Sequence, residues 1–158
     1  MTTAKRAVIS GAILLVLAGW ARPAQAQLPP IDLGAFGLEL CEQRVCGAAI
    51  FVGFLHGQVG DNPNALGTFA VAINHTDLPP TPAQNPAFVT GGFFQFRFGL
   101  LRIRGGIAPG GQLVNNGNST FSVQADLVTS DGDHLEAEVL LDHRAFPPIV
   151  TARVVSSQ

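Results

Sequence analysis

The feature that most constrains the fold is an alternation of apolar and polar residues that continues, with short interruptions, from Cys46 almost to the C-terminus. Side chains along a strand point alternately to opposite faces of a sheet, so a period of two predicts strands with one buried face. No segment shows the longer period of an amphipathic helix. The predicted strands cover residues 46–59, 66–75, 87–98, 101–107, 111–114, 119–129, 134–142 and 149–155.

The hairpin between strands 119–129 and 134–142 can be predicted to its register. A three-residue loop, Ser130-Asp131-Gly132, places apolar residues opposite apolar ones if Gly132 takes the left-handed conformation. A two-residue loop would instead set Leu127 against a glutamate. The predicted inner pairs are Leu127 with Leu135, Ala125 with Ala137, Val123 with Val139 and Phe121 with Leu141; the outer pairs are Asp126 with Glu136 and Gln124 with Glu138.

A second hairpin follows from a change of parity between two apolar rows. Phenylalanines alternate with polar residues up to Phe98, and the alternation resumes out of step at Leu101. A two-residue Gly99-Leu100 loop restores the step, with glycine where a type II′ turn needs it. The predicted inner pairs are Phe98 with Leu101 and Phe96 with Ile103; the outer pairs are Arg97 with Arg102 and Gln95 with Arg104.

Further turn signals complete the predicted architecture. Reversals are expected at Pro109-Gly110 and Asn116-Gly117, and the prolines between Asp77 and Ala87 predict a stiff extended crossing between sheets or edges. Closely spaced reversals favour an antiparallel meander of about seven to eight strands. We therefore expect a single all-β domain over residues 46–158, closed as a small barrel, with a β-sandwich as the alternative.

The first 26 residues have the layout of a cleavable secretory signal. Lys5 and Arg6 precede an apolar stretch that is too short to span a membrane, and Ala24-Gln25-Ala26 forms a small-x-small cleavage site. The predicted location is therefore secreted or periplasmic, in a bacterium, with no membrane span after cleavage. Residues 27–45 are predicted to form an irregular N-terminal arm.

The two cysteines, Cys41 and Cys46, are predicted to form a disulfide within that arm. Exported proteins reside in compartments that favour disulfides. A redox or metal pair is disfavoured because the chain has neither the two-residue spacing nor further thiols. The bridge would fix the entry to the first predicted strand.

The composition after cleavage excludes several classes of protein. Six arginines then face eleven carboxylates, and a net charge of −5 gives no attraction for nucleic acid. The loss of Trp20 leaves a chain without Trp or Tyr, the rings that stack on sugars, so carbohydrate binding is not expected. An outer-membrane barrel is also disfavoured, since phenylalanine alone makes a poor interfacial girdle.

Arg97, Arg102 and Arg104 form the most distinctive charged cluster. Two arginines facing each other across strands destabilise a sheet, so another group must offset them. One explanation is a surface network with the acidic residues of neighbouring strands, namely Asp126, Glu136 and Glu138. The functional alternative is a site for an anion or a docking face for a partner protein.

Catalytic and metal motifs are weak. Three of the four histidines lie close in sequence to a carboxylate, but no two have the spacing that places both imidazoles on one metal ion. No serine lies in a strained nucleophile turn. We therefore predict no metal, no cofactor and no catalytic residues. The histidines are His56, His75, His134 and His143.

Three functions remain open. The first is a non-catalytic exported domain that acts by structural or protein contact. The second is a carrier of a small apolar ligand, for which a phenylalanine-rich barrel interior is suitable. The third is a small enzyme that uses histidine and carboxylate groups, which would require a concave site that gathers at least two of the four histidines.

Overall fold

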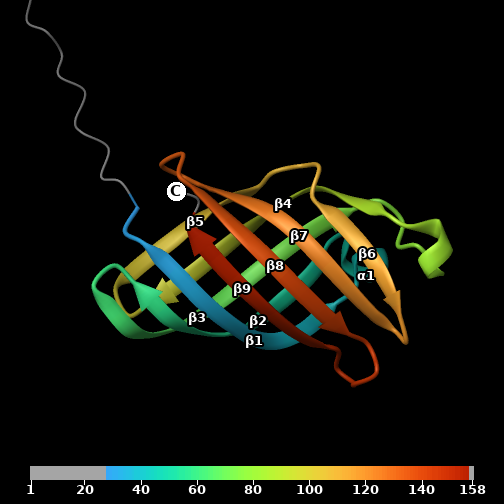
Figure 1. Ribbon diagram of the computed structural model, residues 1–158, viewed down its shortest axis with the longest axis horizontal. Helices are drawn as coiled ribbons and strands as arrows, with labels where there is room; N and C mark the ends of the chain where they lie inside the picture. Colours follow the sequence, from blue (N-terminus) through green and yellow to red (C-terminus); the bar gives the residue numbers. More distant parts are fainter. Residues whose placement is uncertain (1–27, 157–158) are drawn as a thin grey trace, which may run out of the picture.

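A computed structural model describes residues 28–156 of the chain. Its nine strands form one antiparallel sheet (Figure 1). The signal peptide expected over residues 1–26 lies outside the described residues. The strands are β1 Ile31–Cys41, β2 Ala49–Val59, β3 Asn62–His75, β4 Ala87–Phe98, β5 Leu101–Ile107, β6 Gln112–Gly117, β7 Thr120–Thr129, β8 His134–Asp142 and β9 Ile149–Ser156; α1 (Gln43–Cys46) joins β1 to β2, and a 3-10 turn (Pro82–Gln84) lies between β3 and β4.

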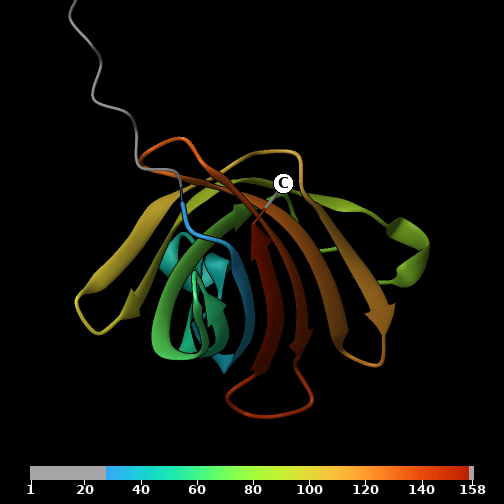
Figure 2. The same ribbon diagram turned by 60° about the vertical axis from the view of Figure 1, so that its left-hand side comes forward.

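Eight of the strands close into a barrel. Going round, β1, β2, β3, β4, β5, β7, β8 and β9 each pair with the next, and β9 pairs with β1 (Figure 2). The short β6 is additional to the barrel, since it pairs with β4 and β7 where β5 has ended. The all-β prediction is thus confirmed, and the fold is the barrel rather than the sandwich.

Both predicted hairpin registers are confirmed. Leu127 lies opposite Leu135 and Val123 opposite Val139, and Gly132 has a φ of 91° in the three-residue loop. In the other hairpin Phe96 lies opposite Ile103, and Gly99 has a φ of 59°. Local turn chemistry and burial of one face fix both pairings.

The segment expected to be an irregular arm is instead a strand, which is the main correction to the prediction. β1 pairs with β2 on one side and with β9 on the other, so the barrel begins at Ile31 rather than at residue 46. The alternation is hidden in the sequence because Phe36 points outward, 53% exposed, while Glu39 points inward and is buried. The prediction of a disulfide between Cys41 and Cys46 is confirmed.

Two loop predictions also need correction. The proline-rich segment does not cross between sheets, because the strands that it connects, β3 and β4, are direct neighbours. The reversal expected at Asn116-Gly117 lies two residues later. Asn118 and Ser119 take positive φ values of 51° and 58°, and Gly117 remains in β6, paired with Thr120. Asparagine tolerates the left-handed region well enough to start such a turn.

The barrel interior is apolar. The largest fully buried side chains are Phe94, Phe96, Leu33, Leu55, Leu135 and Val89. In the middle of the barrel, Gly37 of β1 lies opposite Gly53 of β2, and the ring of Phe69 lies against both. A small void of about 50 Å³ remains there, lined only by apolar side chains.

Candidate functional site

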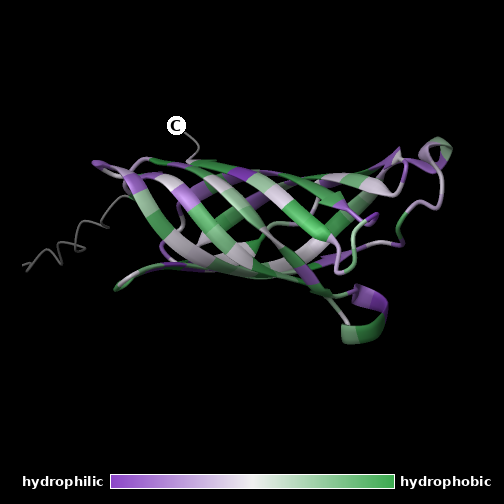
Figure 3. Cartoon of the chain, turned by 90° about the horizontal axis from the view of Figure 1, so that it is seen from below, coloured by the Kyte–Doolittle hydropathy of each residue, from purple (hydrophilic) through white to green (hydrophobic). Residues whose placement is uncertain are grey.

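The candidate site lies at the end of the barrel that carries α1. The long connection between β3 and β4, residues 76–86, leaves the barrel at the same end (Figure 3). The β6–β7 turn and the connection between β8 and β9, residues 143–148, also lie there, because strands alternate in direction. We call this end the mouth.

Two links hold α1 at the mouth, one covalent and one formed by hydrogen bonds. The disulfide joins Cys41, the last residue of β1, to Cys46, the last residue of α1. Gln43 binds the backbone of His75 at the end of β3 through both of its amide atoms. A helix of one turn has little stability of its own, so these links fix its place.

The proline-rich connection is fixed by a buried asparagine. Asn115 of β6 is only 7% exposed, and its side-chain amide donates to the carbonyl of Pro79 over 2.8 Å. The side chain of Asn85 pairs with the Asn115 backbone, accepting from N–H over 2.7 Å and donating to the carbonyl over 2.9 Å. Pro79 is itself buried. The connection is therefore docked on the rim of the mouth.

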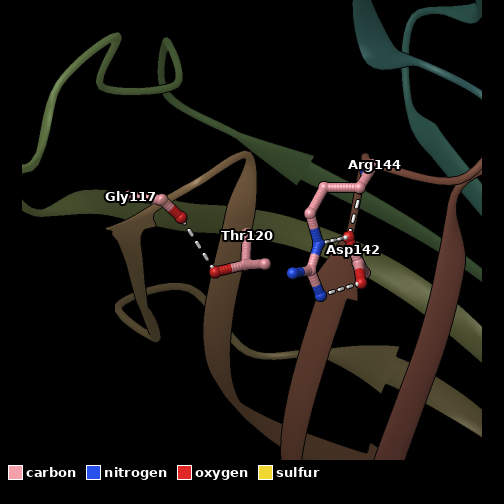
Figure 4. Close-up of polar contacts among 4 residues, drawn as sticks. All are labelled: Gly117, Thr120, Asp142 and Arg144. Atoms are coloured by element: carbon pink, nitrogen blue, oxygen red, sulfur yellow. Dashed lines mark hydrogen bonds and ion pairs between the residues drawn. The ribbon is translucent and has the colours of Figure 1, made fainter.

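On the opposite rim, an ion pair fixes the start of the 143–148 connection (Figure 4). The guanidinium of Arg144 binds both carboxylate oxygens of Asp142, and the Arg144 N–H also donates to that carboxylate. These bonds lower the pKa of Asp142 to about 2. Thr120 donates to the carbonyl of Gly117 across the neighbouring turn (Figure 4). His143 lies between the two paired residues, and its N–H donates to the carbonyl of Ser119.

These elements enclose a cavity of about 310 Å³ at the mouth. The strands supply most of its apolar lining, and α1 and the connections supply most of its polar and charged groups. Phe51 and Ile73 line both this cavity and the small void in the middle of the barrel, so they form the partition between the two. The other apolar lining residues that belong to strands are Ala49, Leu113, Phe121, Val123 and Leu141.

Glu39 and His143 form the buried polar pair in the cavity wall. The Glu39 side chain is 4% exposed, and its Oε2 lies 3.0 Å from Nε2 of His143, whose side chain is 21% exposed. Neither atom makes a hydrogen bond of good geometry with any described residue. Burial raises the pKa of Glu39; the charge of nearby Glu42 adds to that rise, and His143 opposes it. The ring of His143 also packs against Phe121, with 5.4 Å between the ring centres.

The structure brings two of the four sequence-identified histidines together at the mouth. His75 and His143 line the same cavity from different rims. The other two lie on the outside of the barrel: His56 packs over Gly34, and His134 contacts Asp126 at 3.1 Å. The concave site required for the enzyme hypothesis therefore exists, although Glu39 was not among the residues singled out from the sequence.

Glu39 was missed because it lies in the segment predicted to be an irregular arm. One signal could have found it. Ile31, Leu33 and Ala35 keep a period of two. If this strand continues, Gly37 and Glu39 face the same, buried side. A glutamate on the buried side of a strand is a departure from the rule that charged residues stay outside, and such departures mark candidate sites.

The arginine cluster forms on the outer face, away from the mouth. Arg97 lies opposite Arg102, as the register predicted. Arg104 is beside Ser130, just after the end of β7, whereas Asp126 lies four residues earlier in the chain, about 13 Å from Ser130 along the strand. None of the ion pairs within residues 28–156 includes the three arginines, so the expected surface network does not form around them. An anion site or partner face there stays a prediction.

Large apolar side chains are also exposed on the outside of β1, β2 and β3. Phe36 lies opposite Phe54, and the two side chains are 53% and 70% exposed. Leu40, further along β1, and Leu66 of β3 are 60% and 77% exposed. We call these four residues the apolar outer face.

In the part of the chain that the structure describes, no three His, Cys, Asp or Glu side chains gather as metal ligands would. Nor does either helical segment in that part have the length and apolar character needed to cross a lipid bilayer. Comparisons of the chain with protein-family models, with curated proteins and with solved structures find no match.

Proposed function

We propose that this protein is an exported carrier that binds one small, mainly apolar molecule in the mouth cavity. The supporting observation is the cavity, with its mostly apolar wall and the Glu39–His143 pair in that wall. Sites for small molecules are typically concave, mostly apolar and about 300 to 1,000 Å³ in volume, with a few polar groups that orient the ligand. The mouth cavity has each of these properties.

An acid–base enzyme is the second candidate function. It is favoured by the presence of His75, His143 and the buried Glu39 around one cavity. General acid–base catalysis requires such groups within reach of a substrate. We prefer the carrier because most of the cavity wall consists of side chains without acid–base chemistry.

A role in contact with another protein, which the sequence also allows, stays a prediction. The apolar outer face is the surface on which such a role would depend, since large exposed apolar patches mark interaction sites. It lies on the outside of β1, β2 and β3, whereas the cavity lies within the barrel mouth. The two roles can therefore be tested separately.

Titration with N-phenyl-1-naphthylamine tests the carrier proposal. This neutral dye becomes fluorescent in apolar surroundings, and we expect saturable uptake of one molecule per chain. Ala49→Phe places a large ring in the cavity, where Ala49 is 4% exposed, and should abolish uptake. Displacement of the dye by decanol provides a second measurement that needs no variant.

Ala70→Phe is the matched control. It makes the same substitution on β3 at a position outside the cavity lining, and dye uptake should be unchanged. Absence of saturable uptake would contradict the proposal. So would uptake that survives Ala49→Phe, with cooperative unfolding retained, but falls in a Phe36→Ser variant, because the dye would then be bound on the apolar outer face.

A further inference from the structure

We propose that the mouth cavity selects ligands that carry an ammonium group on an apolar body, with Glu39 as the group that binds the ammonium. This inference rests on the proposed carrier function and specifies its ligand class. It follows from three observations: the charges around the cavity, the unsatisfied oxygen of Glu39, and the contact between that oxygen and His143.

The charged side chains that line the cavity are mainly acidic. Glu39 at the end of β1, Glu42 at the start of α1 and Asp77 after β3 face a single guanidinium, that of Arg44. The two histidines add positive charge only when they are protonated. An apolar molecule with a positive end therefore matches the cavity in both charge and polarity, whereas a fatty acid would bring its carboxylate towards Glu39.

Glu39 supplies the specific contact. Its Oε2 is shielded from solvent and receives no hydrogen bond of good geometry from the described residues. A buried acceptor without a donor costs free energy, which a ligand can recover by supplying one. An ammonium group supplies up to three N–H donors together with the opposite charge, whereas a hydroxyl supplies one donor and no charge.

His143 is the protein side chain nearest to this carboxylate oxygen among the contacts at the mouth. Its Nε2 lies 3.0 Å from Oε2 of Glu39, so the imidazole lies beside the place that the ligand's ammonium would take. Glu42 also acts on Glu39 from the start of α1, and Arg44, His75 and Asp77 lie around the rim. An ammonium group that binds Glu39 therefore shares this carboxylate with His143.

Three ten-carbon probes with different head groups test the inference. Decylamine, decanol and decanoate share one apolar chain, and each can be titrated against the bound dye on the intact protein at pH 7.5. We expect decylammonium to bind about tenfold or more tightly than decanoate, with decanol between them, since charge-assisted hydrogen bonds in buried sites have this effect.

Glu39→Gln removes the charge and keeps the size of the side chain. In this variant decylamine and decanol should bind within about threefold of each other. Glu138→Gln is the matched control, because Glu138 lies on the outer side of β8 opposite Arg153; the preference for the amine should persist. If Glu39→Gln does not fold, Glu39→Asp replaces it: the shorter side chain withdraws the carboxylate from the ligand, so the preference for decylamine over decanol should fall.

The outcomes separate the two proposals. If none of the three probes displaces the dye, the carrier function itself is wrong. If all three bind equally, or decanoate binds most tightly, the carrier stands and the ammonium preference is wrong. A preference for decylamine that is unchanged in Glu39→Gln would also overturn the role of Glu39.

Discussion

Gln43 binds both backbone polar groups of His75: its Oε1 accepts from the His75 N–H over 2.7 Å, and its Nε2 donates to the His75 carbonyl over 2.8 Å. The two residues are 32 positions apart in the chain. The side-chain amide of Gln43 thus makes the two hydrogen bonds that a residue of a neighbouring strand would make with His75. It ties α1 to the barrel at the point where the cavity opens.

Replacing Gln43 with alanine should therefore loosen α1. Two partly buried hydrogen bonds are lost, which is expected to lower the free energy of unfolding by about 1 to 2 kcal/mol. Urea denaturation measures this loss, and hydrogen exchange at the His75 amide should become faster. Gln95→Ala, on the outer face of β4 opposite Arg104, is the control and should change stability little. Equal losses of stability in the two variants would argue against a stabilising role of the Gln43–His75 hydrogen bonds.

Removing the disulfide by Cys41→Ser with Cys46→Ser should lower stability by about 2 kcal/mol, because a bridge that closes so short a loop restricts the unfolded chain only modestly. The variant should also bind the dye more weakly, since α1 forms part of the mouth. Thiol titration of the unfolded parent protein before and after reduction checks that the bridge exists. Reactive thiols before reduction would contradict the structure.

The glycine pair in the middle of the barrel predicts a strong steric effect. A methyl group at Gly53 would lie 2.7 Å from the Phe69 ring and closer still to the carbonyl oxygen of Phe36. Gly53→Ala should therefore destabilise the protein by about 2 kcal/mol, as overpacked cores do. Gly106→Ala in β5 is the control, because the nearest atom there is 3.8 Å away. Thermal unfolding of the two variants is the measurement.

Burial of Glu39 predicts a pH dependence of stability. Its pKa is raised above the ordinary value of 4.5, so the folded state holds this proton more tightly than the unfolded state does. The resulting stabilisation is present below pH 4.5 and is lost as the pH rises through the raised pKa. Glu39→Gln should therefore gain stability relative to the parent between pH 4.5 and neutrality, by urea denaturation at several pH values. A difference that does not vary with pH would contradict the raised pKa.

The facing arginines on the outer surface predict a stabilising charge reversal. Arg97 and Arg102 lie directly opposite each other and neither has an ion-pair partner among residues 28–156. Arg102→Glu should therefore raise the free energy of unfolding by about 0.5 kcal/mol, and the gain should shrink in high salt. Arg153→Glu, which breaks a pair with Asp32, should act in the opposite direction. A loss of stability in Arg102→Glu would show that Arg102 has an attractive partner.

The hairpins whose registers could be predicted are those whose apolar residues share one parity and whose turns contain a suitable glycine. The hairpins around Gly99 and Gly132 meet both conditions, so even their registers follow from the sequence. β1 meets neither. Its outward Phe36 and inward Glu39 reverse the expected pattern, and both positions make sense only once the barrel is closed around them.

The site could not be predicted because its walls come from connections that are far apart in the chain. The disulfide was predictable from local spacing, and the histidines were identified as candidates, but their meeting at one cavity depends on strand direction and barrel closure. The docking of the proline-rich connection depends on Asn115, whose role is invisible in sequence because it is an ordinary polar residue beside a turn.

The seam between β1 and β9 joins the first and last strands of the barrel. Seven residue pairs, from Asp32 with Val155 to Leu38 with Ile149, hold it together, and the N–H of Ile31 also donates to the hydroxyl of Ser156. β9 is the last of the nine described strands to be synthesised, so β1 lacks its second partner until all the others have been made. Until then the sheet has two open edges, and the barrel cannot close.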